Sequence, residues 1–594
     1  MEIREQQPVS TVRKTKTLKI GGKHIRPSTI LMSAVLVWFI AIFLIYPNIN
    51  TILTVFWQDG EFTLRAFERV FNSPIAVSAL RNSFILAPIL SVTVGFVGIS
   101  LVLITDYFAI KGATILRLGY MTTLLYGGII LVSGYRFLYG AGGFLTNIII
   151  GIFPYFNPNW FEGFWAVLFV MTFAATGGHL IFIRNAIRTV DYQTIEAAKN
   201  MGASTLTILL KVVLPVLTPS LIVVTVLTFL GGLAAIAAPL LVGGRDFQTI
   251  NPMILSFSAM QNSRDLAALM ALFLGVASFI LIGFLSWLER RGHYLSVSKT
   301  KTEMTKQEIK NPVFKALAHI YAYLLFVIYT APVVLIVLFS FTNDASIIRR
   351  ELSFSAFTLE NYISAFTNRA SIQPLLTSLL YSFVASALAG IMMIFVCRVI
   401  TKSKGKFAMF LEYAFMIPWL LPSALIALGL LMSFDRPRWF VGNQPLIGTM
   451  GIMILGYVIV IIPFTLRMTR SAFFAIDDTL EDAAKNLGAS SFYTFYKVIL
   501  PIISPSLLAI FALNFNLLLS EFEMSRFLFH PLARPLGVHI ESLTMDGGGS
   551  GIAYTFVYAV IMMAISAIVL WVTYGRKSGN KSSKAKVQQA PPMT

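Results

Sequence analysis

The stretch TIEAAKNMGASTLTILLKVVLPVLTPSL, residues 194–221, occurs a second time in this chain as LEDAAKNLGASSFYTFYKVILPIISPSL, residues 480–507. The two copies align without gaps at a constant offset of 286, and 14 of their 28 positions are identical. Self-similarity at a fixed offset is typical of a chain built from repeated structural units. The sequence therefore predicts two halves of similar fold.

Apolar segments long enough to cross a membrane surround both copies of this repeat. Apolar residues make up 56% of the 594 residues and charged residues only 12%, and the mean hydropathy is +0.76. A helix that rises ~1.5 Å per residue needs about 20 apolar residues to cross a ~30 Å hydrocarbon layer. This composition predicts an all-α polytopic membrane protein with about 12 transmembrane helices. The expected spans are 29–49, 83–105, 114–138, 164–186, 213–241, 266–288, 317–341, 375–397, 407–432, 446–468, 499–522 and 554–574.

Each copy of the repeat lies between the fourth and fifth expected spans of its half, which predicts two parallel six-helix repeats related by an axis along the membrane normal. Segment 144–156 is too short and too interrupted by Asn and Pro to span, so we expect it to be interfacial or re-entrant and external. The expected organisation is a basic tail at 1–28, a first half at 29–288, a charged linker at 289–316, a second half at 317–574 and a basic tail at 575–594.

The net charge of +19 is concentrated outside the apolar segments. Lys and Arg are retained on the cytoplasmic side of membrane proteins. Both termini, the linker and both copies of the repeat are therefore expected in the cytoplasm. The basic tails lie next to membrane spans, where cytoplasmic orientation and attraction to anionic lipid explain their positive charge. We therefore expect no nucleic-acid partner.

Each repeat copy predicts a short amphiphilic helix outside the membrane, over about 191–205 and about 477–491. Asp191 and Asp477 stand at its start, where a carboxylate can cap exposed N–H groups. Small residues follow, and they would let the backbone of another protein approach closely. A Gly within a helix costs up to ~1 kcal/mol relative to Ala, so Gly at matching positions indicates a packing or turning role. The small residues are Ala197, Ala198 and Gly202, with Ala483, Ala484 and Gly488 as their counterparts.

This pattern resembles the signature loop of binding-protein-dependent ABC importer permeases. The signature is Glu-Ala-Ala, three residues, Gly, nine residues, an aliphatic residue, any residue and Leu-Pro. It reads here Glu196-Ala197-Ala198, Gly202, Val212 and Leu214-Pro215, and again Asp482-Ala483-Ala484, Gly488, Val498 and Leu500-Pro501. The second copy departs from the signature at Asp482, which keeps the charge of Glu on a shorter side chain.

The resemblance implies that each loop forms a coupling helix that docks into a cleft of a separate cytoplasmic ATPase. The chain would then fuse two permease halves in a bacterial plasma (inner) membrane, surrounded by lipid. Two copies of the ATPase would drive alternating access, and an extracytoplasmic binding protein would deliver the substrate. The fused arrangement and the motif resemble ferric-iron uptake permeases most closely, while importers of thiamine, phosphonate and polyamine share much of the pattern.

Motifs for catalysis are absent from the sequence. It contains no G-x-x-x-x-G-K-[ST], so ATP and Mg are expected on the partner ATPase and no cofactor on this chain. It also lacks H-E-x-x-H and G-x-S-x-G, so we expect a transport subunit rather than an enzyme. Cys397 is the only cysteine, and no metal site can be assigned from the sequence.

The repeat breaks at Glu521 and Glu523, where the first half has Ala235 and Ala237 at the same offset. Ionisable residues inside a membrane tend to face a bundle interior or a wet path. Their hard oxygen ligands would suit a hard cation such as ferric iron, or a cationic organic solute. The alternative is that both carboxylates pair with nearby arginines at the outer interface, namely Arg526 or Arg534.

Two further charged side chains lie in expected spans. Glu412 is early in the ninth span, where a role in the substrate path and a role at the membrane interface are both open. Arg136 lies near a span end and is expected to extend its charged group to an interface.

Two other classes of protein remain open. A secondary transporter can also have 12 spans in two parallel halves, but ion-coupling carboxylates or basic relays in mid-membrane are sparse here. A membrane scaffold without transport activity is the third possibility.

Overall fold

The computed structural model describes residues 18–20, 23–25, 27–58, 60–124, 127–291, 305–402, 405–546 and 548–575. Most of the two basic tails and the middle of the charged linker lie outside the described residues. The described chain is almost entirely helical, with two short hairpins formed by β1 (Leu18–Ile20) with β2 (Lys23–Ile25) and by β3 (Trp57–Gln58) with β4 (Glu61–Phe62).

The helices of the first half follow one another in the order expected from the apolar segments. They are α1 (Pro27–Phe39), η1 (Ile40–Ile45), α2 (Tyr46–Phe56), α3 (Arg65–Phe71), α4 (Pro74–Val102), η2 (Leu103–Tyr107), α5 (Ala113–Tyr120), η3 (Met121–Leu124), α6 (Gly128–Tyr139), α7 (Phe144–Ile152), α8 (Phe164–Ala174), α9 (Gly177–Ile187), α10 (Tyr192–Asn200), α11 (Thr205–Ile208), η4 (Leu209–Val213), α12 (Leu214–Leu233), α13 (Ala237–Val242), α14 (Ile250–Ala259), η5 (Gln261–Ser263) and α15 (Arg264–Arg291).

The second half has a similar order. Its helices are α16 (Pro312–Ser340), α17 (Asp344–Arg349), η6 (Phe354–Ala356), α18 (Glu360–Thr367), α19 (Arg369–Lys402), α20 (Lys406–Leu420), α21 (Ser423–Phe434), η7 (Trp439–Val441), α22 (Met450–Phe474), α23 (Asp478–Asn486), α24 (Ser491–Thr494), η8 (Phe495–Ile499), α25 (Leu500–Leu519), α26 (Glu523–Leu528), α27 (Leu536–Asp546), α28 (Gly549–Leu570) and η9 (Trp571–Gly575).

Within the described residues, ten helices are long and apolar enough to cross a membrane, and two bent helix pairs raise the number to 12. The pair α8 and α9 bends by 42°, and the pair α20 and α21 by 104°. The second break falls at Leu421 and Pro422, whose extended backbone ends one helix before the next begins. The predicted number of about 12 spans is reached when each bent pair is counted as one span.

The third expected span, 114–138, is wrong in its bounds. The chain forms α5 and η3 first, and α6 begins at Gly128, whose φ of +56° favours glycine. Segment 144–156 also differs from the expectation, because α7 continues the apolar run of α6, so that Gly128–Ile152 as a whole passes as a candidate span. Glycines at positions 140, 142 and 143 separate the two helices.

The offset of 286 extends well beyond the two repeated stretches. It relates α11, η4, α12 and α13 to α24, η8, α25 and α26, each beginning and ending at equivalent positions. In both halves a turn of π-helix precedes the Leu-Pro pair, and the Leu214 N–H donates five residues back to the Leu209 carbonyl. Leu500 donates to Phe495 in the same way. The duplicated sequence therefore reproduces the local backbone in each half.

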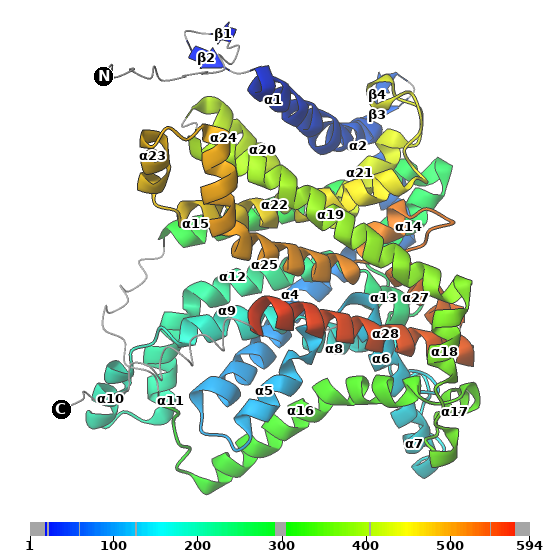
Figure 1. Cartoon of the computed structure of the whole chain (residues 1–594). Helices are drawn as coiled ribbons and strands as arrows, with labels where there is room; N and C mark the ends of the chain where they lie inside the picture. Colours follow the sequence, from blue (N-terminus) through cyan, green and yellow to red (C-terminus); the bar gives the residue numbers. More distant parts are fainter. Residues whose placement is uncertain are drawn as a thin grey trace, which may run out of the picture.

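The first span of each half packs against the other half (Figure 1). The first span, α1 to α2, lies along α20 and α21, and the Asn50 amide donates to the Ser433 hydroxyl at 3.1 Å. In turn α16 packs on α5 and α6, and the Tyr120 hydroxyl donates to the Ala322 carbonyl at 2.7 Å. This exchange ties the two halves into one bundle.

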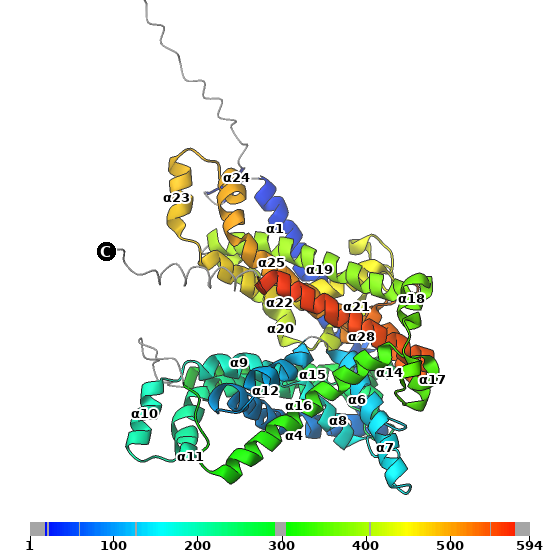
Figure 2. The same cartoon turned by 60° about the horizontal axis from the view of Figure 1, so that its bottom comes forward.

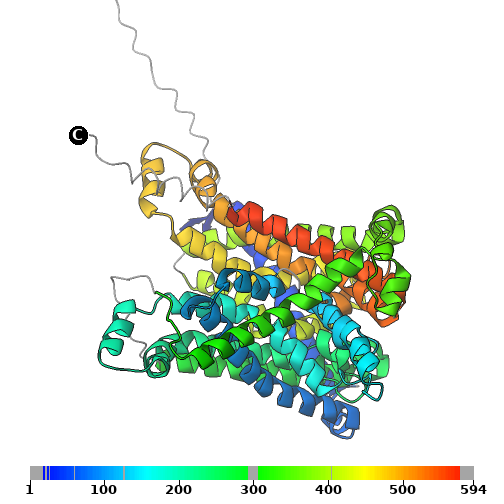
Figure 3. The same cartoon turned by 90° about the horizontal axis from the view of Figure 1, so that it is seen from below.

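The short helices of the two repeats project from the same end of the bundle. Figure 1 shows α10 and α11 beside one corner and α23 and α24 beside the other, and Figures 2 and 3 keep both pairs at that end. The helices α7, α17 and α18 lie at the opposite end. We call these the coupling end and the far end.

Candidate coupling and transport site

An aspartate caps the start of each projecting helix. The Asp191 carboxylate accepts a hydrogen bond from the Gln193 N–H at 3.0 Å, and Asp477 accepts one from the Thr479 N–H at 3.0 Å. Each bond occupies an N–H that has no partner within the helix. The bond from Thr479 lowers the pKa of the exposed Asp477 below its ordinary value. Both helices therefore begin with the same rigid N-terminal turn.

A glycine ends each projecting helix with a left-handed turn. The φ angles of Gly202 and Gly488 are +83° and +80°, and a Cβ at either position would meet nothing within 4 Å. In the first copy the N–H of Gly202 donates to Lys199 and that of Ala203 to Ala198, at 2.9 and 3.0 Å. This is the Schellman arrangement that favours glycine. Within this chain, backbone conformation rather than crowding requires the two glycines.

The motif residues of both helices face solvent at the coupling end. Glu196, Ala197, Asp482 and Ala483 are exposed, and Ala198 and Ala484 are partly buried. Asp482 also forms an exposed ion pair with Lys485 at 3.1 Å.

Large apolar side chains accompany them, since Met201 is 87% exposed and Leu487 is 89% exposed. Apolar groups outside the spans with no partner in the described chain are typical of a protein interface.

The second projecting helix is anchored by an ion pair that the sequence analysis missed. Both Glu481 carboxylate oxygens accept from Arg398, at 2.5 and 3.1 Å, which ties α23 to the end of α19. The equivalent position in α10 is Ile195, which is fully buried. The sequence signal for this difference was the Glu at position 481 of the second copy, where the first copy has Ile195. The two helices are therefore held by different forces.

Glu521 and Glu523 line a cavity of ≈ 590 Å³ between the two halves. The first half contributes residues of η3, α6, α9 and α13, and the second half contributes residues of α21, α22, α25, α26 and α28. The Glu521 carboxylate accepts from the Met524 and Ser525 N–H groups at 2.6 and 3.0 Å. It also accepts from the Ser525 hydroxyl at 2.7 Å. The first turn of α26 thus occupies the carboxylate of Glu521, which lies just before that helix.

Glu523 has more capacity for a ligand. Within the part of the chain that the structure describes, its carboxylate has one side-chain donor, the Ser423 hydroxyl at 2.5 Å. Among the described residues, neither carboxylate forms the ion pair that was the alternative expectation, and Arg526 pairs with Glu541 at 2.6 Å instead. Arg534 lies beside the Phe529 ring.

The structure does not bring Glu412 to this cavity. Glu412 forms an ion pair with Arg470, which links α20 to α22. The counterpart of Arg470 at the offset of 286 is Arg184, which pairs with Asp106 at 3.0 Å. Corresponding arginines in the two halves thus form interhelical ion pairs.

Within the described ranges, no group of three or more His, Cys, Asp or Glu side chains could hold a metal ion. The two carboxylates of the cavity can therefore contribute to a transient contact with a cation, but they do not form a complete resident site.

Comparison with known proteins gives a family match over both halves. The model of the binding-protein-dependent transport system inner membrane component matches residues 20–293 and 387–575. A probable ABC transporter permease protein, y4fN of Sinorhizobium fredii, is 35% identical over 539 residues, which cover 91% of this chain and 94% of that protein.

Two more distant relatives differ in how much of the chain they cover. The ferric transport system permease protein FbpB of Actinobacillus pleuropneumoniae is 22% identical over 91% of this chain and 77% of its own length. The putative 2-aminoethylphosphonate transport system permease protein PhnV of Salmonella choleraesuis is 27% identical over 37% of this chain and 82% of its own length.

Proposed function

This chain belongs to the family of binding-protein-dependent transport system inner membrane components and is a multi-pass ABC importer permease, and on this premise we propose that its substrate is ferric iron. The family supplies the membrane component of the transporter. Two copies of a separate ATPase bind the exposed motifs of α10 and α23, and a binding protein delivers the iron at the far end.

The observation that carries the iron proposal is the pair of second-half carboxylates in the cavity between the halves. Glu523 in particular offers oxygen atoms that its own helix does not occupy. Ferric iron is a hard cation that prefers such ligands. A cation that only two carboxylates bind is released more readily than one held by a complete set of ligands. A transport path requires such release.

The extent of similarity supports the same substrate. The ferric transport relative spans both halves of this chain, whereas the 2-aminoethylphosphonate relative spans little more than one third of it. A phosphonate substrate remains the second candidate, because that relative is 27% identical to this chain over 223 residues.

The proposed mechanism is alternating access driven from the coupling end. Closure of the ATP-bound ATPases draws α10 and α23 together, and the bundle transmits this movement to open the cavity toward the far end. Hydrolysis separates the two helices and returns the cavity to the cytoplasm. The caps and Schellman turns suit this role, because rigid helix ends transmit displacement without unwinding.

Deletion of the gene in its own organism tests the substrate. We expect uptake of radiolabelled ferric iron to fall at least about tenfold and to be restored by a plasmid copy, with uptake of thiamine, 2-aminoethylphosphonate and polyamine unchanged. Uptake is measured for each solute in parallel at limiting concentration. Unchanged iron uptake together with loss of one of the other solutes would assign the permease to that solute instead.

A further inference from the structure

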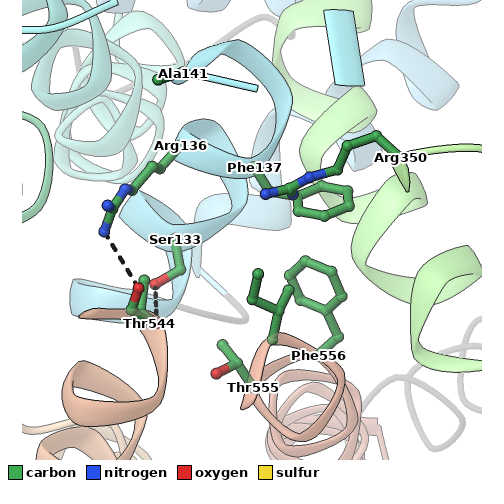
Figure 4. A pocket seen from close by; sticks show the side chains of 9 residues that line it. Ser133, Arg136, Phe137, Ala141, Arg350, Thr544, Thr555 and Phe556 are labelled. Carbon is green, nitrogen blue, oxygen red and sulfur yellow. Dashed lines mark hydrogen bonds between the residues drawn. The ribbon is translucent and has the colours of Figure 1, made fainter. Parts of the chain in front are cut away.

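A second cavity, of ≈ 220 Å³, lies toward the far end and is lined by two arginines from different halves (Figure 4). Arg136 belongs to α6 of the first half, and Arg350 follows α17 of the second half. The remaining lining combines polar, aromatic and aliphatic side chains. It consists of Ser133, Phe137, Ala141, Thr544, Ile552, Thr555 and Phe556.

Arg350 is held in place by an unusual backbone conformation and by an aromatic ring. It is one of two non-glycine residues with positive φ among those described, at φ +58°. This left-handed conformation ends α17 and directs the side chain across the gap to the first half. The guanidinium carbon lies 3.9 Å from the centre of the Phe137 ring. Such stacking positions a guanidinium and leaves its N–H groups free to donate in its plane.

Arg350 is partly buried, and one of its guanidinium nitrogens lacks a partner among the described residues. Its Nη1 atom is buried and has no hydrogen-bond partner in the described chain. An unsatisfied buried donor is costly, and more so when the group is charged. Arg136 donates to the Thr544 carbonyl at 3.4 Å, a long bond. Neither arginine forms an ion pair within the described ranges.

The two positive charges also act on each other. Burial and, to a smaller extent, the charge of Arg136 together lower the pKa of Arg350 to about 10. Glu162 acts electrostatically on Arg136 without forming an ion pair in the described structure. An anion between two guanidinium groups would remove their repulsion and supply the missing acceptor.

We propose that this cavity binds a small oxyanion, a phosphate, phosphonate or carboxylate group, between the guanidinium groups of Arg136 and Arg350. The guanidinium groups are the donors, because the Ser133 and Thr555 hydroxyls already donate to carbonyls of their own helices. The bound anion bridges α6 to α17 and the neighbouring α27 and α28. It therefore holds the two halves together at the far end, a role separate from iron transport.

The affinity of the purified full-length chain for inorganic phosphate tests this site. We expect phosphate to raise the melting temperature in a saturable way at constant ionic strength. The variants Arg350→Gln and Arg136→Gln should each weaken the apparent affinity at least about tenfold, since each removes charged hydrogen bonds. Arg349→Gln is the matched control, because this neighbouring arginine is exposed and does not line the cavity.

Arg350→Lys keeps the charge and provides a second test of the site if the glutamine variant does not fold. It should retain a weakened phosphate response, because Lys lacks the planar fork of Arg. A melting temperature without phosphate that matches that of the wild type shows that a variant is folded. A phosphate response equal in the wild type and in both glutamine variants would overturn the proposal.

The oxyanion could come from solution or from the headgroup of an anionic phospholipid. Native mass spectrometry of protein purified from membranes containing phosphatidylglycerol separates the two sources. Lipid retained by the wild type and by Arg349→Gln but lost from Arg350→Gln supports the site with lipid as its natural ligand. A phosphate response in lipid-free protein, with no arginine-dependent lipid, supports it with a free anion. Absence of both effects would contradict the site.

Discussion

The double variant Gly202→Val, Gly488→Val is expected to insert into the membrane and to lose ATP-driven uptake. Both glycines have φ near +80°, where an L-residue costs ~1–2 kcal/mol and a β-branched residue is a genuine outlier. Valine must therefore unwind the last turn of α10 and of α23. Met201 and Leu487, the exposed apolar residues directly before these glycines, would then no longer fit the ATPase. Uptake in cells and the amount of ATPase that co-purifies should both fall at least about tenfold.

The matched control is Gly202→Asn, Gly488→Asn. Asparagine tolerates the left-handed conformation better than other non-glycine residues, so these variants should keep most of the uptake. Wild-type uptake in the valine variant would count against a coupling role for the two helices. Equal loss in the valine and asparagine variants would show instead that the ATPase contacts these positions too closely for any side chain.

The second large effect is expected at Glu523, the cavity carboxylate with unoccupied oxygen atoms. Glu523→Gln keeps the shape of the side chain and an acceptor for the Ser423 hydroxyl, but it removes the negative charge. A hydrogen bond or contact to a charged group contributes ~1.5–3 kcal/mol, so loss of the charge should lower iron uptake at limiting concentration by about tenfold to a hundredfold. Expression and ATPase binding should stay unchanged.

Glu308→Gln provides a control for the same chemical change, because Glu308 is exposed and does not line the cavity. Uptake of radiolabelled ferric iron by both variants is compared at equal protein levels. If Glu523→Gln transports iron at the wild-type rate, the cavity carboxylate has no part in the substrate path and the iron proposal loses its main support.

The duplicated fold could be predicted because its signals are local. The repeated stretch defines the offset of 286. The same offset also relates helices of the two halves whose sequences differ. Asp191 and Asp477 stand directly before polar helices, where the short range of a capping bond makes the sequence sufficient. Family membership also removes the secondary transporter from the open alternatives.

Other features depended on contacts between distant segments. Hydropathy reports the length of a span but not its bend or its neighbours. The 104° bend between α20 and α21 and the packing of α16 on the first half were therefore not predicted. Arg136 was expected to extend to an interface, yet it lines a cavity with Arg350, more than 200 residues away in the sequence.

The central claim is that a separate cytoplasmic ATPase drives transport through α10 and α23. The most direct test is uptake of ferric iron into proteoliposomes that contain this chain, its ATPase and its binding protein, with ATP supplied on the ATPase side. The account predicts uptake that requires hydrolysable ATP and does not respond to an imposed proton or sodium gradient. Gradient-driven uptake by the chain without ATPase and nucleotide would contradict it.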